Sequence, residues 1–192
     1  MSRWTARLCA IAVLPVIACS GGRSGPLVYT DPPDRGALRL VRNDAATARH
    51  MLLDLVVGDA ALTGYSVGFD LPLDATKVTL GTFSPGTALD PGAEPIAAAA
   101  TIATEGPLAG MLVVGQSQKA GGAGAVAGDT TLGPGTLLFT IELDVTLPLV
   151  EGVVFDGTAK DFVLPSGGLR DRLGLTVVTP GEVQIGRLEV QR

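Results

Sequence analysis

The stretch from Thr136 to Thr146 reads TLLFTIELDVT and decides the expected fold class. Apolar residues alternate along it, and those predicted to point inward are Leu137, Phe139, Ile141, Leu143 and Val145. Between them, Thr140, Glu142 and Asp144 are predicted to point outward. Successive side chains of a β-strand point to opposite faces of its sheet. The pattern therefore predicts a strand with one face in a core and the other in solvent.

Gly64 to Leu71 (GYSVGFDL) shows the same alternation and places Ser66 and Asp70 on its outer face. Shorter apolar or alternating runs, bounded by Gly and Pro turns, predict further strands at 38–42, 51–57, 76–83, 110–117, 153–164, 174–178 and 182–190. The Ala-rich segment from Leu89 to Glu105 is expected to form a short helical turn or a loop, and Lys119 to Pro134 a Gly-rich connection. About nine strands without intervening helices predict an all-β fold. We expect a two-sheet antiparallel β-sandwich with a jelly-roll or Greek-key path.

The composition of the 192 residues agrees with this class, since 26 Gly and 13 Pro favour short strands joined by tight turns. The net charge is −5, with 14 basic and 19 acidic residues. Arg3 and Arg7 belong to the expected signal peptide, so the mature charge is 14 − 2 − 19, or −7. A chain of this charge without a basic patch is not expected to bind nucleic acid.

The N-terminus has the three-part plan of a secretory signal. Two arginines lie in the first seven residues, Leu8 to Ala18 is apolar, and Val16-Ile17-Ala18-Cys19 follows. The apolar run is too short to span a bilayer. Its end resembles the lipobox of bacterial lipoproteins, which implies cleavage before Cys19, lipid on that cysteine and attachment to the cell envelope. Because Ser20 rather than an aspartate follows, the same resemblance favours the outer membrane.

This interpretation divides the chain into a signal peptide at 1–18, a flexible linker at 19–36 and one domain at 37–192. The linker assignment rests on the Gly, Pro and Ser content of residues 20–36. Cys9 would be removed with the signal and Cys19 blocked by lipid, so the domain is expected to lack a disulfide.

Few residues of the mature chain suit catalysis, and we expect no enzyme. His50 is its only histidine and is interpreted as an ordinary residue at a strand edge. The nearest carboxylate pairs for glycoside hydrolysis are Asp70 with Asp74 and Glu142 with Asp144, but solvated strands often contain such acids. The Gly-rich run at 121–128 lacks the Gly-Lys-Ser/Thr of a P-loop and is interpreted as a loop.

Calcium and sugars are the two kinds of ligand to be considered. Acids beside turns, Asp31 with Asp34 and Asp156 with Asp161, leave structural calcium as a possible ligand, although no EF-hand spacing is present. No cofactor is expected otherwise. The mature aromatic residues mostly occupy predicted core or linker positions, which argues against a sugar-stacking platform.

The order of these features resembles the cohesin module of bacterial cell-surface and cellulosome scaffold proteins. The resemblance rests on the strand from Tyr65 to Asp70, the Phe83-Ser84-Pro85-Gly86 turn, the strand at Met111 to Gly115 and the late Gly135-Thr136-Leu137-Leu138-Phe139-Thr140-Ile141. It covers Leu38 to Val190 and implies a non-catalytic adhesion module that binds a protein, in that family a calcium-binding dockerin. Since the fold is similar to that of carbohydrate-binding modules, glycan binding is the alternative. The candidate binding surfaces are the outer positions Ser66, Asp70, Thr140, Glu142 and Asp144.

Overall fold

The computed structural model describes residues 26–89, 97–118 and 128–192, and these contain no α-helix. The signal peptide, Cys19 and most of the Gly-rich run at 121–128 lie outside the described residues. Among the described residues, no helix is long and apolar enough to cross a membrane. The strands are β1 Leu27–Thr30, β2 Leu38–Arg42, β3 His50–Val57, β4 Leu62–Gly64, β5 Ser66–Pro72, β6 Val78–Pro85, β7 Ala97–Ile102, β8 Met111–Ser117, β9 Thr130–Leu132, β10 Leu137–Val145, β11 Gly152–Asp156, β12 Ser166–Arg170, β13 Thr176–Val178, β14 Val183–Gln184 and β15 Arg187–Val190. Two single 3-10 turns, η1 Gly106–Leu108 and η2 Pro180–Glu182, complete the elements.

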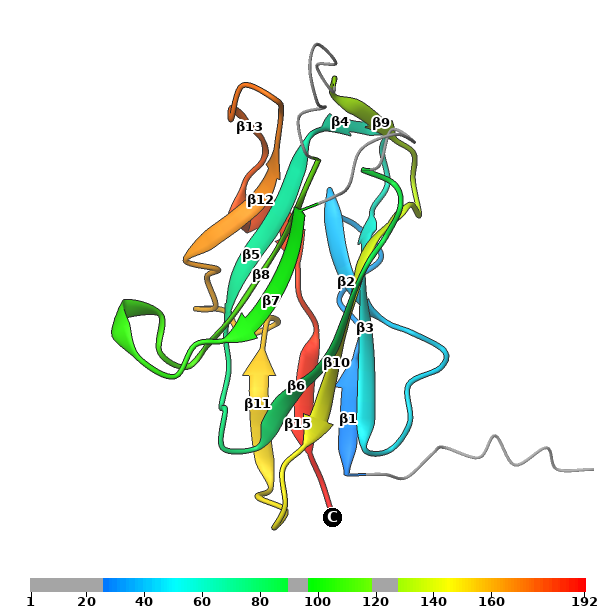
Figure 1. The fold of residues 1–192 in the computed structure, drawn as a ribbon. Coiled ribbons are helices and arrows are strands. Elements are labelled where there is room, and N and C mark those ends of the chain that lie inside the picture. Colours follow the sequence, from blue (N-terminus) through cyan, green and yellow to red (C-terminus); the bar gives the residue numbers. More distant parts are fainter. Residues whose placement is uncertain (1–25, 90–96, 119–127) are drawn as a thin grey trace, which may run out of the picture.

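These strands form four sheets, so the all-β class is confirmed while the simple two-sheet division is not. Two sheets have five strands each, in the orders β14-β2-β3-β10-β6 and β13-β12-β5-β8-β7. A three-stranded sheet, β1-β15-β11, and the pair β4-β9 add to them (Figure 1). All pairings are antiparallel except β14 with β2.

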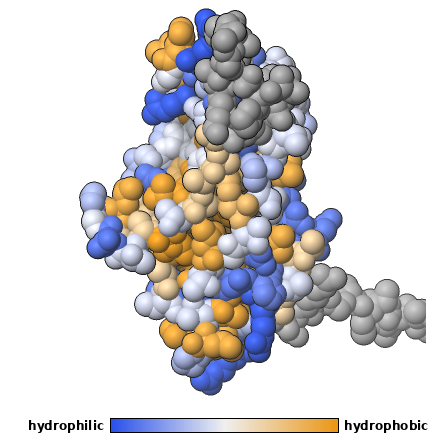
Figure 2. Space-filling model, viewed as in Figure 1, coloured by the Kyte–Doolittle hydropathy of each residue, from blue (hydrophilic) through white to orange (hydrophobic). Residues whose placement is uncertain are grey.

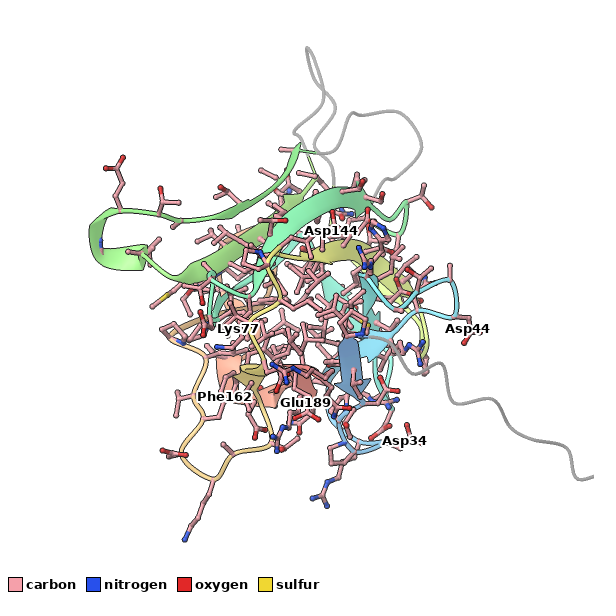
Figure 3. The ribbon with its side chains drawn as sticks, turned by 90° about the horizontal axis from the view of Figure 1, so that it is seen from below. Asp34, Asp44, Lys77, Asp144, Phe162 and Glu189 are labelled. Atoms are coloured by element: carbon pink, nitrogen blue, oxygen red, sulfur yellow. The ribbon has the colours of Figure 1, made fainter. Side chains whose placement is uncertain are left out.

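The two five-stranded sheets contact one another through aromatic side chains. Phe69 of β5 and Phe139 of β10 have ring centroids 5.9 Å apart. Phe83 of β6, in the same sheet as β10, has its ring centroid 5.5 Å from that of Phe139. Seen from below, the side chains between the sheets form one packed interior, with Asp34 and Asp44 on loops at its rim (Figure 3). Burying a large apolar side chain contributes about 1.5–3 kcal/mol, so this interior is the main source of stability.

The strand that decides the fold class follows its predicted alternation except at its two ends. Phe139, Ile141 and Leu143 are fully buried as expected. Leu137, expected inside, is 41% exposed, while its neighbour Leu138 is buried. The cause is a register shift between Leu137 and Phe139 against β3, because a bulge moves the side chains before it to the opposite face. Val145, at the other end, is only half-buried.

The predicted linker is wrong for part of its length, because Leu27–Thr30 is strand β1 and pairs with β15. Leu27 and Tyr29 are buried, and the Tyr29 hydroxyl donates a hydrogen bond to the Leu40 carbonyl at 2.7 Å. The same oxygen accepts one from the Gly186 amide at 2.9 Å. Burial raises the pKa of Tyr29 well above its usual value. The folded domain therefore begins by Leu27 rather than at residue 37.

Three other segments also differ from expectation. Part of the Ala-rich segment forms the edge strand β7, which pairs with β8 along its length. The strand expected over 153–164 ends at Asp156, whose carboxylate accepts hydrogen bonds from the Thr158 amide and hydroxyl and closes a turn. The sequence SGGLR at 166–170, not predicted as a strand, is β12.

Candidate functional site

The five candidate surface residues lie on two different sheets. Ser66 and Asp70 are on β5, and Thr140, Glu142 and Asp144 are on β10. Each is half-buried and alternates with core residues, as the sequence predicted. The structure thus gives two separate candidate surfaces. We call them the β5 face and the β10 face.

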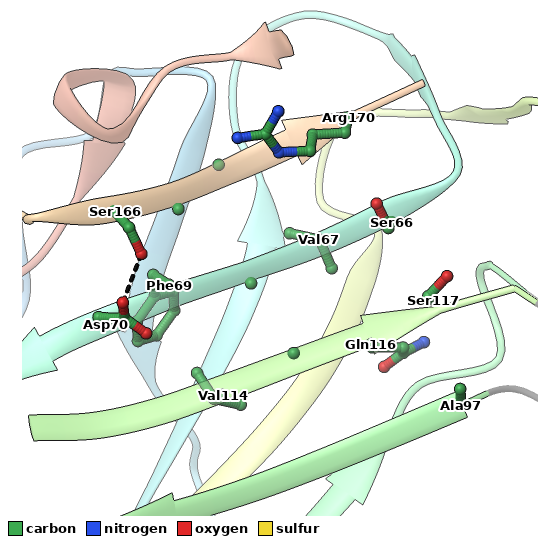
Figure 4. Close-up of a pocket in the computed structure, with 14 residues that line it drawn as sticks. Ser66, Val67, Phe69, Asp70, Ala97, Val114, Gln116, Ser117, Ser166 and Arg170 are labelled. Atoms are coloured by element: carbon green, nitrogen blue, oxygen red, sulfur yellow. Dashed lines mark hydrogen bonds between the residues drawn. The ribbon is translucent and has the colours of Figure 1, made fainter. Parts of the chain in front are cut away.

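The β5 face contains a hollow of about 380 Å³ whose floor consists largely of backbone (Figure 4). Gly168 of β12 is paired with Gly68 of β5, which is paired with Gly115 of β8. Ala99 of β7 continues this row beside Gly115. A row of three glycines and an alanine across four strands leaves the centre of the face almost without side chains.

Polar side chains border this glycine row on both sides. On one side, the register aligns Arg170 with Ser66 and Ser66 with Ser117. On the other side, Ser166 is paired with Asp70, and its hydroxyl donates a hydrogen bond to Asp70 Oδ2 at 2.5 Å. Hydroxyl groups, a carboxylate and a guanidinium therefore surround an apolar floor. This arrangement can hydrogen-bond a ligand that lies across the strands.

Two glycines of β12 are required by the backbone itself. Gly167 has φ +125° and Gly168 has φ +110°, a region that side chains disfavour. A Cβ on Gly168 would lie 1.9 Å from the Val178 carbonyl oxygen. By contrast, the nearest described atom to a Cβ on Gly115 would be the Val67 carbonyl oxygen at 3.7 Å. The floor of the hollow thus contains glycines on β12 that the backbone requires and one glycine on β8, Gly115, that can be replaced by a residue with a side chain.

The rim of the hollow continues into an apolar surface. Ala97, Ala98 and Ala99 of the edge strand β7 are exposed, and Figure 2 shows apolar residues gathered over the β5, β8 and β7 side of the molecule. None of the seven aromatic residues at 26–192 is exposed, and Tyr29, predicted to lie in the linker, is buried as well. The described part of the chain therefore offers no exposed ring on which a sugar could stack.

The β10 face is occupied by polar groups already bonded to one another. The Thr140 hydroxyl donates to Asp54 Oδ1 at 2.6 Å, and the Asn43 side-chain amide donates to Asp54 Oδ2 at 2.8 Å. Farther along the same strands, His50 Nδ1 lies 2.7 Å from Asp144 Oδ1 and 3.3 Å from Glu142 Oε1. Among the described residues, His50, Glu142 and Asp144 form the only group of three or more that could hold a metal ion.

Sequence reasoning placed His50 at a strand edge but missed its two carboxylate neighbours. His50 and Asp144 are 94 residues apart, and only the antiparallel register of β3 with β10 aligns them. The usable signal was limited to a lone histidine at the start of one alternating strand and two acids near the end of another.

Four of the remaining carboxylates singled out in the sequence have partners of their own. Asp31 Oδ1 accepts from the Arg42 amide at 2.6 Å, and Asp34 forms an ion pair with Arg39. Thr158 holds the pKa of Asp156 below its usual value. The Lys77 ammonium, with Thr76, lowers the pKa of Asp74 to about 2. Neither Asp31 with Asp34 nor Asp156 with Asp161 belongs to a described cluster that could hold an ion.

Comparison with known proteins gives no assignment. No family model, no curated protein and no solved structure matches this chain.

Proposed function

We propose that this chain is a non-catalytic binding module of the bacterial cell envelope that holds an extended segment of a partner protein in the hollow of the β5 face. The observation that supports it is the glycine row Gly168–Gly68–Gly115, bordered by hydrogen-bonding side chains. A preformed, rigid surface loses little conformational entropy on binding. The exposed Ala-rich edge of β7 extends the same contact area.

An extended polypeptide fits this site better than a glycan does. Its backbone supplies regularly spaced donors and acceptors for Ser66, Ser117, Ser166, Asp70 and Arg170, and small side chains fit over a floor of glycine. Sugar-binding surfaces usually stack rings on exposed aromatics, and the described residues offer none. Glycan binding through the polar rim alone remains the alternative that the experiment below must distinguish.

The lipobox-like Val16-Ile17-Ala18-Cys19 supports a lipid anchor on Cys19, and Ser20 supports the outer membrane as its location. Two or three acyl chains give durable attachment, because each buried methylene contributes about 0.8 kcal/mol. The packing of the two five-stranded sheets at Phe69 and Phe139 is compatible with a cohesin-like sandwich, to which the β1-β15-β11 sheet is an addition. The partner in that case is a dockerin-like protein.

The hollow contains no pair of groups suited to nucleophilic catalysis. Ser166 donates its hydrogen bond to Asp70, and no histidine lines the hollow among the described residues. An activated serine needs a neighbouring base that accepts its proton and is itself oriented by a third group. This supports a binding role for the β5 face.

The test is a pull-down with the soluble chain that begins at Ser20, since a start at residue 36 would remove β1. Envelope and secreted extracts are passed over immobilised protein with calcium and with chelator, and retained proteins are identified by mass spectrometry. Gly115→Leu fills the hollow at a position open to a Cβ, and Gly128→Leu, where no atom of the described residues lies within 4 Å of a Cβ, is the matched control.

We expect one partner to be retained by the native chain and by Gly128→Leu and lost from Gly115→Leu. Calcium-dependent retention of a dockerin-bearing protein would identify cohesin-type adhesion. Equal retention by Gly115→Leu, or retention on glycan beads alone, would contradict the proposed peptide site.

A further inference from the structure

The second surface, the β10 face, contains a cluster that the binding role of the hollow does not use. His50 Nδ1, Glu142 Oε1 and Asp144 Oδ1 converge, and the three possible ligand atoms lie within 4.8 Å of one another. The side chain of His50 is 54% exposed, that of Glu142 22% and that of Asp144 33%. The cluster is therefore open to solvent on one side and supported by the sheet on the other.

Three neighbouring strands fix the geometry of this cluster. The register pairs His50 of β3 directly with Asp144 of β10, and Glu142 follows two residues away on the same face. From β6, the Thr82 amide donates to Glu142 Oε2 at 3.2 Å and leaves Oε1 directed at the histidine. Such a bond from a neighbouring backbone orients a ligand before an ion arrives.

A glycine keeps the space over the carboxylates free. A Cβ on Gly81 of β6 would lie 2.9 Å from Asp144 Oδ2 and 3.0 Å from Glu142 Cγ. Any larger residue at this position would press on both acids. The sequence TLGTF of β6 thus places its only glycine next to the two acids.

We propose that His50, Glu142 and Asp144 form a binding site for a divalent transition-metal ion of the zinc class. Zinc takes imidazole nitrogen at about 2.0–2.1 Å and carboxylate oxygen at about 2.0–2.2 Å, so neighbouring ligand atoms lie about 3–3.5 Å apart. The separations from His50 Nδ1, 2.7 Å and 3.3 Å, need only small side-chain rotations to reach this spacing. When the ion binds, the Nδ1 lone pair is donated to the metal and takes the place of the hydrogen bonds between Nδ1 and the two carboxylates. Solvent water completes the coordination.

The donor set distinguishes zinc from calcium. Calcium requires six to eight oxygen ligands, whereas this cluster supplies one nitrogen and two carboxylates. Imidazole suits zinc, copper and nickel. The neighbouring acid on the same face, Asp54, already accepts hydrogen bonds from Thr140 and Asn43 and adds no free oxygen to the group.

The test uses the soluble chain from Ser20, which contains every described residue and excludes Cys9 and Cys19, so thiols cannot compete for the ion. It is purified without a histidine tag. Because His50 is the only histidine, ¹⁵N labelling of histidine gives one pair of ring-nitrogen signals. Zinc chloride is added while those signals and the heat of binding are recorded.

We expect one zinc ion per chain and a large shift of the His50 Nδ1 signal. Loss of a partner that only orients a ligand costs about 10–100-fold in affinity, so His50→Gln, Glu142→Gln and Asp144→Asn should each weaken binding by about 100-fold or more. Asp54→Asn, the same change of charge on the same face, is the control and should leave the affinity within about threefold. Circular dichroism verifies that each variant is folded.

Two results would overturn the site. One is an unshifted Nδ1 signal at about 1 mM zinc, which would show that His50 does not ligate the ion and that the three side chains only interact with one another. The other is zinc binding that His50→Gln leaves unchanged.

Discussion

The outer faces of the two five-stranded sheets are built in opposite ways. On the β5 face, the central row is Gly168, Gly68 and Gly115, and the polar side chains stand to either side of it. On the β10 face, the central positions hold Thr140, Glu142 and Asp144, each of which has at least one oxygen engaged by a neighbouring residue. One face leaves backbone uncovered, and the other covers it with two groups of interacting polar side chains, one around Asp54 and one around His50.

This difference separates two ways in which a sheet can bind. A floor without side chains leaves room for the side chains of a ligand. Such a floor recognises the ligand by its shape more than by its charge. A network of charged groups held by backbone bonds is already oriented and accepts a small ion. The same alternating strand pattern produces both, because the outward positions are free to vary while the inward ones form the core.

The largest expected effect concerns the obligatory glycine of the β5 face. Gly168→Ala should destabilise the fold by about 3–5 kcal/mol, since it forces a side chain into positive φ and against the Val178 carbonyl. Gly115→Ala is the matched control and should change the free energy of unfolding by no more than about 1 kcal/mol. Urea unfolding followed by circular dichroism measures both. Similar values for the two variants would mean that the two ends of the row are equivalent.

A smaller effect is expected on the β10 face. Thr140→Val removes the hydroxyl that donates to Asp54 at 2.6 Å but preserves the shape of the side chain. We expect a loss of about 1 kcal/mol, because the bond is only partly buried. Thr79→Val, at an exposed position of β6, should be nearly neutral in the same urea experiment. An unchanged stability of Thr140→Val would show that the network does not stabilise this face.

The smallest effect concerns the turn that joins the two faces. Asp74 lies between β5 and β6, and Lys77 and Thr76 lower its pKa to about 2. Its contribution to stability is complete above its unfolded pKa, about 4, and is lost as the pH falls through 2. Because the side chain is 34% exposed, we expect less than about 1 kcal/mol. Asp74→Asn should therefore flatten the decline in stability between pH 4 and pH 2, and Asp161→Asn, which removes an exposed loop carboxylate, should not.

Strands with a regular period of two could be predicted from sequence, and others could not. β3, β5 and β10 alternate clearly, and their core residues were identified except at the two ends of β10, where the bulge displaces Leu137 and Val145 is only half-buried. β7 is a run of alanines and β12 contains two glycines, so neither has an apolar alternation to detect. β1 was hidden in a segment rich in Gly, Pro and Ser, because its burial depends on the distant β15.

The sites were predictable to a smaller extent than the fold. Period two correctly placed Ser66, Asp70, Thr140, Glu142 and Asp144 on outer faces. It could not show that Ser166 and Arg170 lie beside the first pair, or that His50 lies beside the last pair. Those contacts depend on strand register, which the turns and bulges of the whole chain determine.

The pairing of β1 with β15 has a mechanical consequence for the proposed attachment at Cys19. Seven residues lie between Cys19 and Leu27, so the chain between lipid and fold reaches at most about 30 Å. A partner pulling on the hollow would stretch the domain between the start of β1 and β5, and β1 extends from its first residue toward the half of the molecule that contains β5 (Figure 1). Its four residue pairs with β15 would then resist the load together in shear instead of opening one after another. The first strand of the domain, β1, would thus carry the mechanical load between the lipid anchor and the rest of the fold.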